Sequence, residues 1–385
     1  MKKDKTFKII YFLGFFFALA TALPTYIMSS FIAQYIGVNN VGLFIASTNG
    51  LLLLSILFYP KVIRKFNNLR TMIFLLLLTI ASLLLLGVSQ NIFPILFFFI
   101  IQYITLTLLL INLDIALENI STDNYTGRIR TRFLTMMNMA WVISPLIMGQ
   151  IIDVDNYQRI FLVAGVILLF VLFILYLNKA ALADHKIYYN RKFKNIINIL
   201  KKNKNLLKIF TISLVLRLFY CIMVLYIPIY LHENFGFSWS ALGIVFTVML
   251  LPFVLFEMPA GNAADKFWGE KEIMTLGIGI MLMAVTAVFI TNTTSIIIWA
   301  IILFVSRTGA SLVEAMQETY FFKKVDGKDM DIINVFRDLN PAGWLIGAFI
   351  SYLILQIFNI QIIFLFLSLV LLLALWPALT IKDTK

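Results

Sequence analysis

Several residue types on which enzymes depend are scarce in this chain. It has one cysteine and two histidines among 385 residues, and charged residues make up only 13% of it. The lone cysteine, Cys221, excludes an intramolecular disulfide, and His185 and His232 are too few to form a metal cluster. No HExxH, P-loop or nucleophile motif occurs in the sequence. We therefore expect no metal, no cofactor and no enzymatic activity.

Apolar residues are abundant instead. They supply 61% of the chain, and the mean hydropathy is +0.95. A soluble domain of this length could not bury so much Leu, Ile and Phe, so we expect the chain to lie in a lipid bilayer. About 20 apolar residues span the hydrocarbon as a helix, and the absence of alternation argues against a barrel. Twelve runs qualify: 8–33, 41–60, 71–88, 92–116, 133–152, 159–178, 207–231, 241–260, 273–291, 295–318, 339–356 and 359–379.

The basic residues indicate how these runs are oriented. Of the 31 Lys and Arg, 28 lie at the two ends of the chain or in alternate gaps between runs, and Arg159 alone lies in the other gaps. Basic residues are retained in the cytoplasm, so we expect a multi-pass plasma-membrane protein with both termini cytoplasmic. This bias accounts for the net charge of +12, and we expect no nucleic-acid partner. The first run is too long for a cleaved signal peptide and is interpreted as the first helix.

The longest polar stretch, Asn178 to Lys208, lies near the middle of the chain. It holds nine basic side chains, with apolar residues interleaved at roughly helical spacing. This pattern indicates a basic helix on the inner leaflet, although a calmodulin target or nucleic-acid arm has the same composition. We predict an all-α integral membrane protein with a six-helix bundle at 1–178, a cytoplasmic linker at 179–206 and a second six-helix bundle at 207–385.

The two halves of the chain repeat one pattern. The segment YPKVIRKFNNLRTM after the second run aligns with AGNAADKFWGEKEI after the eighth at an offset of 201 residues. Asp114 and Glu118, at the end of the fourth run, are repeated by Glu314 and Glu318 at the end of the tenth. MAWVIS in the fifth run likewise matches AGWLIG in the eleventh. Two six-helix halves related in this way are typical of secondary transporters, in which the halves rock around a central site.

The loop after the eighth run resembles the signature loop of the major facilitator superfamily. The matching residues are Gly261, Asp265, Lys266, Gly269 and Lys271. The resemblance implies twelve transmembrane helices in two pseudo-symmetric bundles, with a gate at the cytoplasmic helix ends. Two features depart from the family pattern. Trp268 adds a residue before the second glycine, and the loop of the first half has Pro60 and Arg64 in place of Gly and Asp.

Charges at the cytoplasmic helix ends are the candidates for this gate. A carboxylate such as Asp265 is costly at the membrane edge unless it is paired, and Arg337 and Glu318 are its expected partners. The matching residues of the first half are Glu118, Arg130 and Arg132. Such contacts would hold the inner helix ends together while the site faces outward. Static anchoring at the interface explains the same charges.

Two arginines lie near the middle of apolar runs. They are Arg217 in the seventh run and Arg307 in the tenth. Intramembrane charges usually face an interior or a watery cavity. The family resemblance implies that helices one, four, seven and ten line the substrate cavity, which places both arginines there. A guanidinium suits a carboxylate or phosphate, so an anionic or amphipathic small molecule is the expected partner. The alternative is a fixed salt bridge with Glu257 or Glu314 that holds the second bundle together.

Uncharged polar residues complete the expected cavity. They are Thr25, Tyr26, Gln102, Tyr103 and Tyr220. Such groups orient a small molecule, but they also hold helices together. Pro24 is expected to bend the first helix.

Coupling to protons requires a titratable group within the membrane. Glu257, Glu314 and Asp114 are the candidates. Ser144, Pro145 and Gly149 form a degraded version of the pattern that the family's antiporters carry in helix five. We therefore predict a monomeric secondary active transporter that moves a small solute by alternating access, with proton-coupled export favoured.

The alternative is import of a sugar or an organic anion. A membrane glycosyltransferase that uses Asp153 and Asp155, or a channel or receptor, is a weaker interpretation, because the outer loops are short and the half-chain repeat favours a carrier.

Overall fold

The structure is a computed structural model, and its described residues form helices and turns with no strand. They comprise 2–120, 126–152, 156–179, 203–266, 268–325 and 330–382, and the side chains of 2–8, 118–120, 126–131, 265–266 and 330 are outside the description. Most of the predicted linker therefore falls outside the described residues, as do Asp153 and Asp155.

Twelve helices of the described chain are long and apolar enough to cross a membrane. Each of them overlaps one of the apolar runs identified in the sequence, and several extend a few residues beyond it. The predicted all-α fold with twelve transmembrane helices is therefore confirmed. The apolar runs mark the helices well because a spanning segment must satisfy all of its backbone hydrogen bonds within itself.

The chain forms two compact units. Unit 1 contains Met1–Tyr35 and Leu51–Asn190, and unit 2 contains Ile36–Gly50 and Arg191–Lys385. The helix α3 (Val38–Phe66) thus contributes its first part to unit 2 and its remainder to unit 1. In unit 2, a Cβ added to Gly42 of α3 would lie 2.4 Å from the carbonyl oxygen of Ala348, so the two backbones approach closely there.

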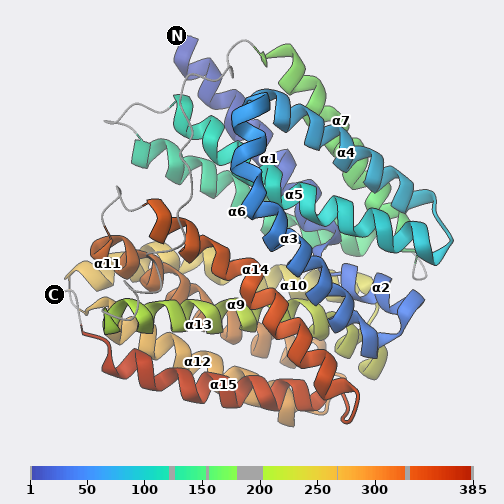
Figure 1. The fold of residues 1–385 in the computed structure, drawn as a ribbon. Coiled ribbons are helices and arrows are strands. Elements are labelled where there is room, and N and C mark those ends of the chain that lie inside the picture. Colours follow the sequence, from blue (N-terminus) through green and yellow to red (C-terminus); the bar gives the residue numbers. More distant parts are fainter. Residues whose placement is uncertain are drawn as a thin grey trace. The chain divides into compact units, whose positions relative to one another are not determined.

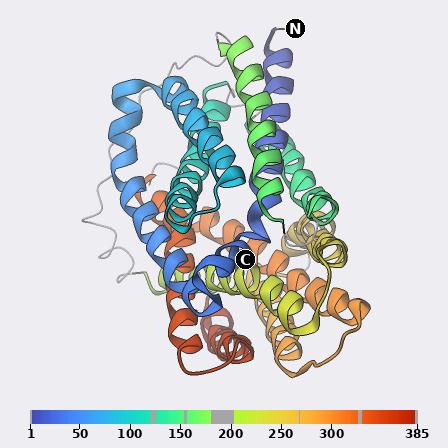
Figure 2. The ribbon, with the colours of Figure 1, turned by 90° about the vertical axis from the view of Figure 1, so that its right-hand side faces the viewer.

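In unit 1, α5, α6 and α7 pack against α1, α4 or both. Helix α1 contacts α6 and α7, and α4 contacts α5 and α7 (Figure 2). Their bounds are α1 Lys2–Thr25, α2 Met28–Ile36, α4 Asn68–Val88, α5 Ile92–Ile120, α6 Thr126–Ile151 and α7 Gln158–Leu177.

In unit 2, α12 lies between α13 and α15, while α9 contacts α13, α14 and α15 (Figure 1). The bounds are α9 Lys204–Ile229, the π-helical turn η3 Tyr230–Asn234, α10 Trp239–Leu255, α11 Glu257–Lys266, α12 Glu270–Ile290, α13 Ile296–Lys324, α14 Met330–Leu355 and α15 Gln361–Thr380. The span that α9 forms with η3, Lys204–Asn234, is the most enclosed of the twelve, with 78% of its most apolar part buried. Within this unit, α13, α14 and α15 pack against α9.

Prolines interrupt the spanning helices at three places. Helix α1 ends one residue after Pro24, and α2 continues the same span from Met28, so the expected bend is a break. Helix α10 ends three residues after Pro252, and α11 continues from Glu257. In the seventh span, α9 passes into η3 two residues after Pro228. Proline has no N–H to donate and its ring clashes with the preceding turn, so it weakens the helix next to each interruption.

Candidate functional site

An ion pair joins α9 to α13 within unit 2. The Arg217 Nη1 atom donates to Glu314 Oε1 at 2.9 Å, and the Tyr220 hydroxyl donates to Glu314 Oε2 at 2.7 Å. The Arg217 and Glu314 side chains are 17% and 26% exposed, so the pair is largely enclosed by protein. Both carboxylate oxygens are thus satisfied by α9. Glu314 is one of the two partners that the sequence allowed for Arg217, and the contact ties the two helices together.

Close helix packing sets the position of this pair. A Cβ added to Gly343 of α14 would lie 2.5 Å from the Cβ of Arg217, so α14 lies directly against α9 there. One turn later, the same addition at Gly347 would meet the Cys221 sulfur at 3.2 Å. The Cys221 thiol donates to the Trp344 carbonyl oxygen at 3.4 Å and acts as a small, buried packing residue. Small residues four apart allow such close crossings of membrane helices, which explains the AGWLIG pattern.

Arg307 occupies a different environment on the same pair of helices. It is 2% exposed, and its Cζ lies 5.1 Å from the ring centroid of Phe219 and 5.3 Å from that of Tyr220. Its Nε has no hydrogen-bond partner, and among the described residues no carboxylate forms an ion pair with it. Arginine remains charged in proteins. A bare arginine in a span costs about 2.5–3.5 kcal/mol on insertion scales, and the two ring contacts reduce this cost without supplying a counter-ion.

The three carboxylates proposed for proton coupling differ in their surroundings. Glu314 is paired as described above. Glu257, at the start of α11, is partly buried and interacts electrostatically with the like charges of Glu314 and Glu318. Asp114, which the repeat relates to Glu314, is exposed on α5. The repeat therefore matches these two residues in sequence but not in environment.

The cavity residues predicted in the first half lie on two elements of unit 1. The Thr25 hydroxyl, at the end of α1, donates to the Thr21 carbonyl oxygen at 2.9 Å, and Tyr26 follows in the turn to α2 and is 3% exposed. On α5, Gln102 is 4% exposed and its Oε1 has no hydrogen-bond partner among the described residues. Tyr103 stacks on Phe99, with 6.3 Å between the two ring centroids. Gln102 is thus a predicted cavity residue with an unused polar atom, whereas the Thr25 hydroxyl is satisfied within its own helix.

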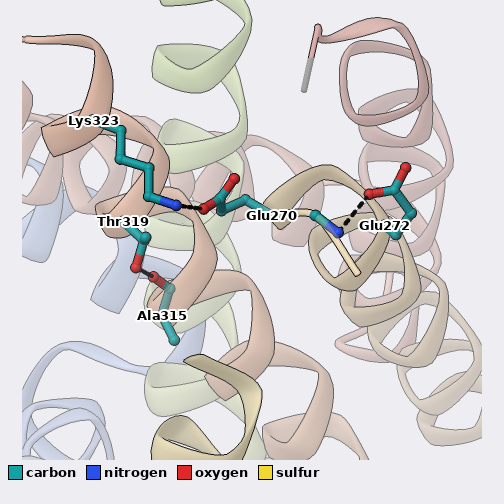
Figure 3. A network of polar contacts seen from close by, with 6 residues as sticks. Glu270, Glu272, Ala315, Thr319 and Lys323 are labelled. Carbon is teal, nitrogen blue, oxygen red and sulfur yellow. Dashed lines mark hydrogen bonds and ion pairs between the residues drawn. The ribbon is translucent and has the colours of Figure 1, made fainter. Parts of the chain in front are cut away.

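The signature loop of the second half leads into the start of α12. Gly269 is the N-cap, and its backbone N–H donates to Glu272 Oε2 at 3.1 Å (Figure 3). The buried Glu270 carboxylate forms an ion pair with Lys323 near the end of α13. Two acidic side chains in the first turn also suit the positive end of the helix dipole. The loop thus ends in a cap and an ion pair that join α12 to α13.

The other predicted gate residues are only partly described. The side chains of Asp265, Lys266, Glu118 and Arg130 lie outside the described residues. Glu318, Arg337 and Arg132 are exposed, Lys271 is partly buried, and a Cβ at Gly261 would meet no atom within 4 Å. The predicted gate pairs therefore stay predictions.

In the first half, a neutral cluster lies where the family pattern is degraded. The Tyr59 hydroxyl of α3 donates to Asn112 Oδ1 of α5. Asn112 Nδ2 donates to Asn68 Oδ1 of α4 at 2.7 Å, and Asn68 Nδ2 donates to the Asn112 carbonyl oxygen at 3.0 Å. All three residues are buried. This cluster, here called the amide clamp, joins three helices of unit 1 without using a charge.

Sequence reasoning missed Phe219, Glu270 and the amide clamp. Asn112 was detectable as a side-chain amide in an apolar run, and Glu270 as a carboxylate that opens a helix after a glycine. Phe219 carried no signal, because one phenylalanine among 36 in an apolar chain is unremarkable.

Comparisons with known proteins agree with this fold. The sequence profile of the Major Facilitator Superfamily matches residues 10–339. None of the curated proteins matches the chain. Among solved structures, a mutant form of the nucleoside transporter NupG has a TM-score of 0.78 at 12% identity, covering 98% of this chain and 99% of that one. A bacterial homolog of the human lysosomal transporter Spinster, in an inward-facing and unoccupied conformation, has a TM-score of 0.67 at 11% identity, covering 99% and 98%.

The profile match includes the first ten of the twelve apolar runs, the first of them from residue 10, and the signature loop. The solved structures, at these low identities, support the fold alone. Together with the twelve spanning helices, these findings establish what kind of protein this is. The chain belongs to the major facilitator superfamily and is a multi-pass membrane transporter rather than an enzyme.

Proposed function

We propose that this chain is a proton-coupled secondary transporter that moves a small solute across the plasma membrane, with both termini in the cytoplasm. The observation that carries the proposal is the Arg217–Glu314–Tyr220 network within unit 2. Its support for the proposal is that Glu314, an ionisable carboxylate on the spanning helix α13, has Arg217 as its cationic partner.

The network has two protonation states with different contacts. When Glu314 is ionised, it holds Arg217 and accepts a hydrogen bond from Tyr220. When Glu314 is protonated, the ion pair is lost and Arg217 must find another partner. A proton thus changes which contacts join α9 to α13, and a ligand drives a conformational change only through such a difference between states. Glu257 is the second candidate for the same role, because its electrostatic neighbours are carboxylates.

Export by exchange with protons is the direction that we propose. The support is the Ser144, Pro145 and Gly149 pattern on α6, where Ser144 is buried and Pro145 lies inside the helix. Import is the second candidate, because an arginine within a spanning helix, such as Arg307, suits an anionic nutrient. The nucleoside transporter NupG shares the fold, so nucleosides belong among the solutes to be tested.

The test is transport in proteoliposomes that contain the purified protein. Wild-type protein and Glu314→Gln are compared with Glu233→Gln, which neutralises an exposed carboxylate of η3. Candidate solutes are sugars, organic anions, amino acids, nucleosides and amphipathic drugs. Uptake is measured with a pH gradient of either sign and, separately, as counterflow without a gradient.

For wild-type protein and Glu233→Gln, we expect saturable counterflow. With an imposed pH gradient, we expect the solute to move in the direction opposite to the protons. Glu314→Gln should keep counterflow and lose its response to the gradient. Gradient-driven transport that survives in Glu314→Gln would refute the coupling role of Glu314. Ohmic current in place of counterflow would refute a carrier, and solute movement in the direction of the proton would replace export with import.

A further inference from the structure

Arg307 is a buried cation without a counter-ion among the described residues. We infer that Arg307 binds the oxyanion of the transported solute, a carboxylate or a phosphate, in a site formed by α9 and α13. This inference rests on the proposed function, because it assumes that a solute passes along this bundle. It narrows the solute class from any small molecule to one with an anionic group.

The neighbouring carboxylates do not neutralise Arg307. Both oxygens of Glu314 are already used, one by Arg217 and the other by Tyr220. Glu257 interacts electrostatically with Glu314 and Glu318, and within the described residues Arg307 is not among its electrostatic partners. The two intramembrane arginines therefore differ. Glu314 neutralises Arg217, whereas no carboxylate in the described part of the chain neutralises Arg307.

The surroundings of Arg307 leave it able to bind a ligand. Phe219 and Tyr220 balance part of its charge through their rings, and a ring contact uses none of the guanidinium N–H groups. The Nε–H is unpaired. A guanidinium presents its N–H groups as a planar fork that matches a carboxylate or phosphate in two parallel hydrogen bonds. An oxyanion would supply both the missing charge and an acceptor for the Nε–H.

Tyr220 links this site to the coupling network. Its ring contacts Arg307 at 5.3 Å and Arg217 at 5.8 Å, and its hydroxyl donates to Glu314. A ligand on Arg307 therefore changes the surroundings of the carboxylate that we propose to carry the proton.

The experiment measures ligand binding by thermal shift of the purified full chain in detergent. The probes are matched pairs that differ in the anionic group: lactate and lactamide, glycerol phosphate and glycerol, and uridine monophosphate and uridine. Each is tested at the same millimolar concentration and ionic strength against wild-type protein, Arg307→Gln and Arg307→Lys. Arg159→Gln is the matched control, because it removes an exposed arginine outside this bundle.

At least one anion should raise the melting temperature of wild-type protein by roughly 2 °C or more above the effect of its neutral partner. Arg307→Gln should weaken that binding by roughly tenfold to a hundredfold, Arg307→Lys should keep part of it, and Arg159→Gln should keep all of it. The carboxylate and phosphate pairs identify which oxyanion is preferred. Without ligand, Arg307→Gln should melt no lower than wild type, because it removes an uncompensated charge.

Three results would overturn the inference. The first is equal stabilisation by both members of every pair, which includes no stabilisation by any probe. The second is anion binding by Arg307→Gln that is as strong as in wild-type protein. The third is a marked loss of stability in ligand-free Arg307→Gln while Arg307→Lys is as stable as wild type, which indicates a structural cation. Binding in detergent needs no gradient. A lack of anion binding here therefore does not bear on the proton-coupling test. A loss of proton coupling likewise does not bear on this binding test.

Discussion

At the scale of single residues, the polar groups inside this membrane protein differ in whether the protein itself satisfies them. Arg217 has Glu314, whereas Arg307 has only aromatic rings within the described chain. Natural proteins keep such a cost where function requires it, because an unpaired intramembrane charge is otherwise unfavourable. The pairing state of a charge is therefore more informative than its presence in an apolar run.

The amide clamp allows a test at this scale. Tyr59→Phe removes the hydroxyl that donates to Asn112 and leaves that buried acceptor without this partner. Interhelical hydrogen bonds in membrane proteins contribute about 0.6–1.7 kcal/mol. We expect the melting temperature to fall by roughly 1–4 °C. Tyr176→Phe is the control, because Tyr176 is 60% exposed. Equal effects of the two changes would show that the clamp does not stabilise unit 1.

At the scale of helices, the contact between α12 and α13 depends on two glycines. A Cβ on Gly309 would lie 2.5 Å from the Gly277 carbonyl oxygen, and a Cβ on Gly277 would lie 2.8 Å from the Gly309 carbonyl oxygen. Gly309 comes two residues after Arg307, so this crossing also positions the proposed anion site. The Glu270–Lys323 pair joins the same two helices near the signature loop (Figure 3).

Gly309→Ala tests this crossing. The new methyl group would press on the backbone of α12, which cannot move aside as a side chain can, and the helices must separate. We expect a loss of about 1–3 kcal/mol in stability, measured by thermal unfolding, with weaker binding of the anions tested above. Gly279→Ala on α12 is the matched control, since a Cβ there meets no atom within 4 Å, and it should be neutral. An unchanged Gly309→Ala protein would contradict the proposed packing role.

At the scale of the whole molecule, the orientation in the membrane is a prediction from the charge pattern. The 28 basic residues at the chain ends and in alternate gaps place both termini in the cytoplasm. Cysteine labelling can test this, because native Cys221 is buried and should give little background. An impermeant thiol reagent should label Asn359→Cys in intact cells and Thr384→Cys only after permeabilisation. The reverse pattern would overturn the orientation, and wild-type protein serves as the unlabelled control.

Much of this molecule was determined by its sequence alone. Which segments span the membrane depends on local composition, because each segment meets the bilayer and must close its own backbone hydrogen bonds. The repeat and the signature loop, at Gly261 to Lys271, could also be recognised in the sequence, because each is a short pattern of neighbouring residues. The family match over residues 10–339 agrees with them.

The tertiary structure decided which residues meet. Arg217 and Glu314 are 97 positions apart, and Tyr59 and Asn112 are 53 apart. Whether such residues touch depends on the rotation of each helix about its axis and on how closely its neighbours approach, which glycines such as Gly309 and Gly343 set. An apolar run has no strong periodicity to record that rotation. The sequence could therefore place two arginines in the membrane, but only the packing of α9 against α13 revealed that, among the described residues, one has a carboxylate partner and the other has none.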